Sequence, residues 1–143
     1  MKIETTRFGT IEIDENKVLK FVRGILGFPN DLHYALLPHR EDSPFFWLQS
    51  LDSPDLAFVV INPSIIVSDY AFELPEDAVE ELEIERPEQA EALVIVTFRH
   101  GEDGESRTMS ANLLGPVVVN VDKRLARQVV LDPNKYPVRY EFH

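Results

Sequence analysis

Residues 110–121 read Ser-Ala-Asn-Leu-Leu-Gly-Pro-Val-Val-Val-Asn-Val, and no other stretch of the chain carries so many aliphatic side chains between so few charges. Residues 117–121 are β-branched except for Asn120, which favours a buried or half-buried strand. Gly115 and Pro116 interrupt the run and remove a backbone donor, so we expect a turn, a bulge or a change of strand there. Asn112 and Asn120 bracket this break, and their amides must either hydrogen-bond within the fold or face a ligand or partner.

The length of 143 residues corresponds to one ordinary domain, residues 1–143, with a core of its own. The chain contains no cysteine, which excludes disulfides and thiolate chemistry and is compatible with a reducing cytosol. The first residues are polar and lack an apolar signal region, and no window approaches about 18 consecutive apolar residues. We therefore expect a soluble protein that is not secreted by a cleavable signal and does not bind a membrane.

The formal net charge is −11, from 25 acidic and 14 basic residues. A surface of this sign repels phosphates, and the chain has no Lys/Arg cluster, so we expect no direct binding to nucleic acid. An acidic protein attracts basic partners instead, although solubility alone also explains many single acidic residues.

Alternating polarity and turn residues predict a mainly β chain. We expect strands at residues 3–8, 10–13, 17–21, 32–37, 45–50, 56–61, 93–99, 107–110, 117–121, 127–131 and 136–142. Residues 125–130 are also compatible with the start of a helical turn. With no repeat or linker between them, these strands predict a single compact antiparallel domain, a β-barrel-like fold or a sandwich, with one or two short helices.

Residues 73–91 form an acidic segment with nine carboxylates and one arginine. Pro75 suits the first turn of a short helix whose positive end lies near Glu76 and Asp77. Pro87 ends that helix and can open a second turn. Such a charge run is typical of a solvated face, but it can also receive a basic partner.

The histidines and serines of the chain form no recognisable catalytic or metal-binding motif. The histidines form no His-x-His or His-Glu-x-x-His pair and are dispersed at positions 33, 39, 100 and 143. The serines at positions 43, 50, 53 and 64 lack a Gly-x-Ser-x-Gly elbow, and no dinucleotide or phosphate loop is present. The sequence pattern thus predicts an acidic mainly β protein that binds partners rather than an enzyme, with no metal or cofactor.

Six motifs, in order along nearly the whole chain, resemble the FliW family of flagellar assembly factors. They are Thr-Arg-Phe-Gly-x-Ile at 6–11, Phe-x-x-Gly-Ile-Leu-Gly-Phe-Pro at 21–29 with Tyr34, Phe-Trp-Leu-Gln-Ser at 46–50, residues 58–63, Asn-Leu-Leu-Gly-Pro-Val-Val-Val-Asn at 112–120, and Arg-Gln-Val-Val-Leu at 127–131 with Tyr136 and Arg139.

This resemblance implies a small β-barrel-like fold and a non-enzymatic role in the cytoplasm. Family membership implies two protein partners. One is flagellin, bound before export in the manner of a chaperone. The other is the translational regulator CsrA, whose repression of flagellin mRNA would be antagonised by an allosteric effect rather than by RNA mimicry.

We expect acidic side chains to steer the basic partner and aromatic side chains to anchor it. The candidate partner-binding residues are Phe45, Trp47, Glu76, Asp77, Glu80 and Glu81, for which core packing and simple solvation are the alternatives. Two other functions stay open: a small-ligand-binding or hydrolytic barrel with a pocket near Asn112, Asn120 and a histidine, and a structural component of the flagellum.

Overall fold

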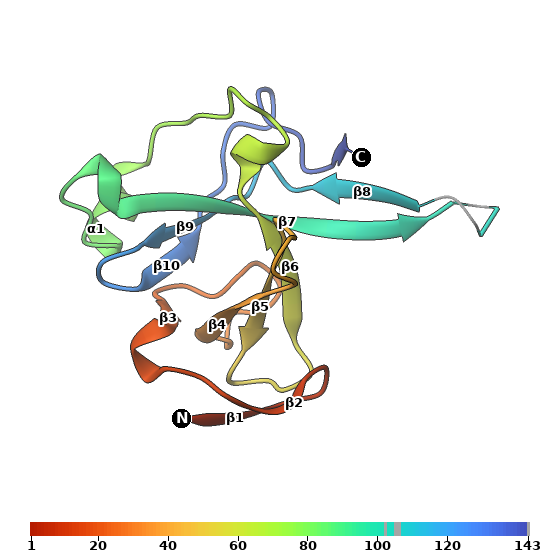
Figure 1. The fold of residues 1–143 in the computed structure, drawn as a ribbon. Helices are drawn as coiled ribbons and strands as arrows, with labels where there is room; N and C mark the ends of the chain where they lie inside the picture. The colour runs from red at the N-terminus through yellow and green to blue at the C-terminus, as the bar shows by residue number, and fades with distance from the viewer. Residues whose placement is uncertain (102, 105–106, 143) are drawn as a thin grey trace.

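The computed structural model describes residues 1–101, 103, 104 and 107–142. Over these residues the chain forms eleven β-strands, one α-helix and three short 3-10 helices, which confirms the mainly β prediction. A small hairpin of β1 (Lys2–Thr5) and β2 (Gly9–Glu12) lies at one end of the molecule (Figure 1). The other strands form one sheet: β3 (Val18–Phe21), β4 (His33–Pro38), β5 (Phe46–Ser50), β6 (Ala57–Ile61), β7 (Ala90–His100), β8 (Arg107–Ala111), β9 (Val117–Asn120), β10 (Leu125–Gln128) and β11 (Tyr140–Phe142).

The long strand β7 closes this sheet into a barrel. Its first residues pair with β9, from Ala90 opposite Asn120 to Leu93 opposite Val117, while its centre pairs with β6. The closed ring therefore runs β7-β6-β5-β4-β3-β10-β9 and back to β7. The last part of β7 leaves the ring and pairs with β8, which pairs in turn with β11, so this arm projects to one side in Figure 1.

All of these pairings are antiparallel except the one between β3 and β10. The prediction of an antiparallel barrel is therefore confirmed, except that β3 and β10 form one parallel pair. Parallel neighbours need a long connection, and here the rest of the barrel separates β3 from β10 along the chain.

The stretch at residues 110–121 changes strand at its Gly-Pro break, as predicted: β8 ends at Ala111 and β9 begins at Val117. All four residues of β9 are buried, because the strand is covered on both faces. Val117 and Val119 belong to the barrel interior, and Val118 packs in a separate cluster with residues of α1. A strand covered on both faces carries a continuous apolar run rather than an alternating one.

The C-terminal strands differ from the predicted ranges. The strand expected at residues 127–131 begins earlier, at Leu125, and the helical alternative is wrong. Arg124, with φ of 61°, ends a turn after β9 and lets Leu125 pair at once with Asn120. The edge strand expected at residues 136–142 is limited to β11, because the Pro137 carbonyl accepts hydrogen bonds from Leu113 and Leu114 instead. The glycines and acidic residues at 100–105, between the strands expected at 93–99 and 107–110, predict a turn; positions 102 and 105 of it lie outside the described residues.

Candidate functional site

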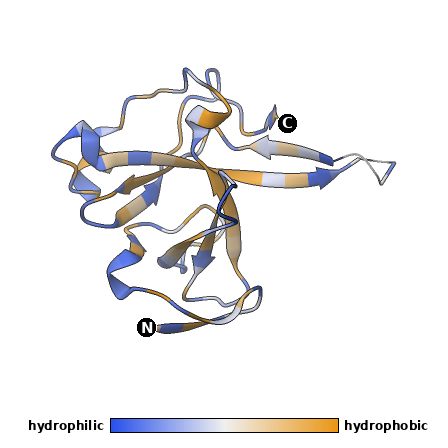
Figure 2. Ribbon diagram, in the orientation of Figure 1, coloured by the Kyte–Doolittle hydropathy of each residue, from blue (hydrophilic) through white to orange (hydrophobic). Residues whose placement is uncertain are grey.

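The acidic segment forms α1 (Glu76–Glu81), with Pro75 at its N-cap, and a 3-10 turn at Pro87–Gln89. Ala78 and Leu82 are fully buried and pack on Val118 of β9 and on Val129. The helix is therefore fixed to the outside of the barrel by its apolar side, and Figure 2 shows that α1 is mostly hydrophilic elsewhere.

Two of the four predicted acidic residues on α1 have a structural role. Arg127 is only 8% exposed, and its Nη1 donates to Asp77 Oδ2 at 3.2 Å and to Glu81 Oε2 at 2.7 Å. Arg23 also donates to Glu81, from Nε at 3.0 Å. The hydrogen bond from Arg127 lowers the pKa of Asp77, and the one from Arg23, with the charge of Arg127, lowers the pKa of Glu81. Asp77 and Glu81 thus tie α1 to β10 and to the loop after β3.

The other two predicted acidic residues, Glu76 and Glu80, are exposed. Neither takes part in an ion pair or side-chain hydrogen bond within the part of the chain that the structure describes. Their carboxylates are available to a partner without breaking an internal contact.

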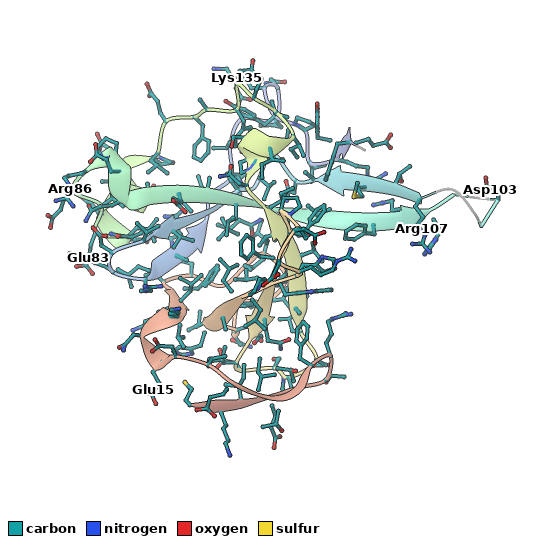
Figure 3. The ribbon with its side chains drawn as sticks, in the orientation of Figure 1. Glu15, Glu83, Arg86, Asp103, Arg107 and Lys135 are labelled. Atoms are coloured by element: carbon teal, nitrogen blue, oxygen red, sulfur yellow. The ribbon has the colours of Figure 1, made fainter. Side chains whose placement is uncertain are left out.

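A hollow of about 760 Å³ lies beside α1 and is called the acidic groove here. Apolar side chains such as Phe72, Leu74 and Ile84 line it, and its carboxylates come from Glu73, Glu85 and Glu91, with Arg86 as a counter-charge. In Figure 3, Glu83 and Arg86 mark the outer edge of this end of the molecule. Lys123 pairs with Glu83 at 3.1 Å, so part of the local acidity is already neutralised.

The two predicted aromatic residues lie on a different surface. Trp47 contacts Phe8 edge-on, with ring centroids 5.8 Å apart, and the Arg7 guanidinium lies 4.3 Å from the centre of the Trp47 ring. Phe45 lies 6.0 Å from Phe98, which is 53% exposed. Both Phe45 and Trp47 are half-buried, so each combines packing with an accessible edge.

The rings of Phe45, Trp47 and Phe98 border a hollow of about 540 Å³, called the aromatic groove here. Arg40 and Arg107 lie at this groove together with a single carboxylate, Asp42. The groove is therefore locally basic in a chain of net charge −11. Figure 3 places Arg107 near the outer end of the projecting β7–β8 arm, where it pairs with His100, on the opposite side of the molecule from Arg86.

The structure does not bring the predicted aromatic and acidic residues into one site. Ala90 and Ala92, at the start of β7, line the acidic groove, whereas Phe98, near its end, lines the aromatic groove. A third hollow, of about 550 Å³, opens at one end of the barrel between them and is called the barrel mouth here. It shares Asn62 and Glu91 with the acidic groove, and Ser43 and Pro44 with the aromatic groove.

The alternative of a ligand pocket near Asn112 and Asn120 gains no support, because both amides hydrogen-bond within the fold and neither lines these three hollows. Asn120 is fully buried; its Nδ2 donates to the carbonyls of Leu82 and Glu83, and its Oδ1 accepts from two backbone amides. Asn112 Oδ1 accepts from Gly115 N at 2.9 Å. A side chain on Gly115 would meet the amides of Gln128 and Asn112, which explains the glycine at the break.

One serine does meet a histidine, which the sequence did not signal. His39 Nδ1 lies 3.1 Å from Ser43 Oγ, at the rim of the aromatic groove. Ser43 Oγ also accepts the amide of Phe45, and no carboxylate orients His39 among the described residues. A catalytic triad would need a carboxylate to orient the histidine, so we interpret the His39–Ser43 contact as part of the turn.

Sequence reasoning missed several residues of these surfaces. Phe98 and Arg7 were not among the predicted partner-binding residues, although the alternation of residues 93–99 could have placed Phe98 outside the barrel. Arg127, which holds two of the predicted acids, lies in an apolar run and gave no signal of its role. Among the described residues, no three metal-binding side chains lie together. No helix in that part of the chain has the length and apolarity to cross a bilayer.

Comparisons with known proteins agree with one another. The model of the FliW protein family matches residues 2–142. The flagellar assembly factor FliW of Syntrophus aciditrophicus (strain SB) is 45% identical over 141 residues, covering 99% of this chain and 87% of that protein. The flagellar assembly factor FliW of an Exiguobacterium species (strain AT1b) is 46% identical, over 98% and 93% of the two chains.

A crystal structure of the flagellar assembly factor FliW superposes on this fold with a TM-score of 0.84. The two sequences are 34% identical, and the match covers 98% of this chain and 95% of the other. The match in sequence and the match in three dimensions extend over nearly the whole barrel, and the chain belongs to the FliW family.

Proposed function

We propose that this chain is a flagellar assembly factor that acts in the cytoplasm by binding two proteins, flagellin and CsrA. Its relatives are named flagellar assembly factors, which supports the role in assembly. The two partners follow from the family resemblance of the motifs. In this scheme flagellin is held before export, and free protein captures CsrA and relieves its repression of flagellin mRNA.

The observation that supports this proposal best is the separation of two exposed surfaces of opposite character on one barrel. The α1 face offers Glu76 and Glu80, which no internal cation neutralises among the described residues. RNA-binding proteins carry basic surfaces, so these carboxylates attract CsrA at long range and increase its association rate.

The aromatic groove supplies the anchoring contacts in this proposal. Aromatic and arginine side chains dominate binding energy where they are half-buried and surrounded by polar groups. Phe45 and Trp47 meet this description, and the exposed Phe98 beside Phe45 and the Arg7 guanidinium over Trp47 extend the surface. An amphipathic segment of flagellin is the partner we assign to this groove.

Calorimetric titration of the protein with flagellin and CsrA, separately and then together, tests the proposal. Failure to bind either protein would overturn it. A second arm uses stopped-flow association with CsrA and the double variant Glu76→Lys/Glu80→Lys. We expect its association rate constant to fall by about tenfold at low salt, with a weaker salt dependence. The free energy of unfolding should fall only slightly, because a lysine at position 76 lies at the positive end of α1.

A matched control is the double variant Glu4→Lys/Glu15→Lys. Both residues are exposed on the N-terminal segment, and Figure 3 shows Glu15 away from the α1 end. The net charge changes by the same amount, so an equal loss of rate in both variants would mean that total charge, and not the α1 face, attracts CsrA.

A further inference from the structure

The two ends of the barrel are built differently. At one end the loop at residues 24–31 closes the interior: Ile25 is 2% exposed and belongs to the interior cluster, and Phe28 packs edge-on against Phe58 at 5.3 Å. At the other end, where β3, β7 and β10 begin, the barrel mouth opens over the interior with a volume of about 550 Å³. This volume lies within the range of small-molecule sites.

The floor of the barrel mouth is apolar. Leu19 and Val119 belong to the interior cluster, and Phe46 and Leu93 pack against it. At the rim, Leu36 is 36% exposed and Ile65 is 58% exposed. The filled centre of the barrel thus ends in an uncovered apolar surface, which favours an occupant with a hydrocarbon part.

The charges at the rim are mainly positive. Lys17 and Arg124 line the mouth together with one carboxylate, Glu91. The side chains of Lys17 and Arg124 make no ion pair within the described part of the chain. Arg124 is also fixed at its backbone, where its amide donates to the Asn120 carbonyl and its own carbonyl accepts from Lys20. A positive rim over an apolar floor, in a chain of net charge −11, is complementary to an amphipathic anion.

We propose that the barrel mouth binds a small amphipathic monocarboxylate. The hydrocarbon chain lies on Leu19, Leu93 and Val119, and the carboxylate faces Arg124 and Lys17 at the rim. Burial of the chain supplies the affinity, and the two cations select an acid over an alcohol of equal length. The argument for this site does not rest on the binding of flagellin or CsrA, although the mouth shares lining residues with both grooves.

NMR titration of the full chain with octanoate, hexanoate and 1-octanol tests the site. We expect octanoate to shift the amide resonances of mouth residues such as Leu36, Leu93 and Arg124. Each buried methylene strengthens binding about fourfold, so hexanoate should bind about 15-fold more weakly. 1-Octanol should also bind more weakly, because it lacks the charge. No saturable shift at millimolar octanoate, or an affinity that does not depend on chain length, would overturn the proposal.

Two variants localise the site. Lys17→Gln/Arg124→Gln should lose the preference for octanoate over 1-octanol. The control Lys2→Gln/Arg99→Gln makes the same change of charge at two exposed residues that do not line the mouth, and it should keep the preference. Leu36→Trp places a larger side chain across the opening and should abolish binding while the amide spectrum stays folded. Octanoate binding that persists unchanged in folded Leu36→Trp would place the ligand elsewhere and refute the assignment.

Discussion

The side chain of Asn120 connects the barrel to α1, and its removal should cost more stability than that of any exposed asparagine. Its Nδ2 donates to the Leu82 carbonyl at 2.8 Å and to the Glu83 carbonyl at 3.2 Å, just after the end of α1. Its Oδ1 accepts from the amides of Asp122 and Lys123 at 3.1 and 3.2 Å. One side chain therefore holds both the helix end and the turn that leads to β10.

The magnitude of the loss in Asn120→Ala follows from the exposure of the groups left behind. The bond to Leu82 is buried, so the orphaned carbonyl bears most of a desolvation penalty of about 2 kcal/mol. The other three bonds are partly exposed, and water can replace them at a cost of about 0.5–1 kcal/mol each. We expect the free energy of unfolding to fall by about 4 kcal/mol, a large part of the stability of an ordinary domain.

Urea unfolding followed by tryptophan fluorescence measures this loss, since Trp47 is the only tryptophan. The control Asn62→Ala removes an exposed cap whose Oδ1 accepts from Ser64, and it should cost only about 1 kcal/mol. If Asn120→Ala lost no more than Asn62→Ala, the reasoning from burial would be refuted. In Asn120→Asp the new carboxyl faces two carbonyls, so its folded-state pKa should be raised. Its stability should then fall as pH rises from about 4 to neutral, because the folded state binds the extra proton.

Two further changes test other buried or hydrogen-bonded groups. Tyr34 is fully buried, and its hydroxyl has no hydrogen-bond partner among the described residues, so Tyr34→Phe should raise the free energy of unfolding by about 1 kcal/mol; a comparable loss in urea unfolding would contradict this. Partial burial of Asp52 favours a higher pKa, but the amides of Leu32 and His33 outweigh it and lower the pKa below its ordinary 3.8. Because the pKa is lowered in the folded state, ionised Asp52 stabilises the fold above pH 3.8, and this stabilisation is lost as the pH falls below 3.8. Asp52→Asn should therefore be less stable than wild type at pH 7 and nearly equal to it at pH 2. Thermal unfolding at the two pH values measures this difference.

Local sequence patterns predicted the elements of this fold well, because period-two alternation and turn residues act over a few neighbours. The hairpin of β5 and β6 lies where two apolar runs flank Asp52-Ser53-Pro54-Asp55, and α1 begins directly after Pro75. The sequence could not show that β7 pairs with β9 at its start and with β8 at its end. This change of partner along β7 depends on strands that lie far from it in the sequence.

The candidate site was predictable by residue type but not by arrangement. The acidic run suggested a charged face. It did not show that Arg127, 50 residues from Asp77 in the sequence, forms ion pairs with two of the four candidate carboxylates, Asp77 and Glu81. Nor did it show that α1 and Trp47 lie on different surfaces, since the curvature of a closed barrel decides which strands share a side. For the same reason the barrel mouth, lined by residues from 17 to 124, has no sequence signature.

The separation of the two grooves does not prevent one partner from excluding the other. A standard protein interface covers about 800 Å² of each partner, and the accessible surface of this chain is 8915 Å². A partner centred on either groove therefore extends beyond it, and the barrel mouth shares lining residues with both. Footprints of flagellin and CsrA that meet over the mouth would clash without any change in the barrel. Linkage then requires each protein to weaken the other by the same factor. Leu36→Trp, which fills the mouth but leaves Trp47 and α1 in place, would alter both affinities if this overlap operates and neither if the antagonism passes through the fold.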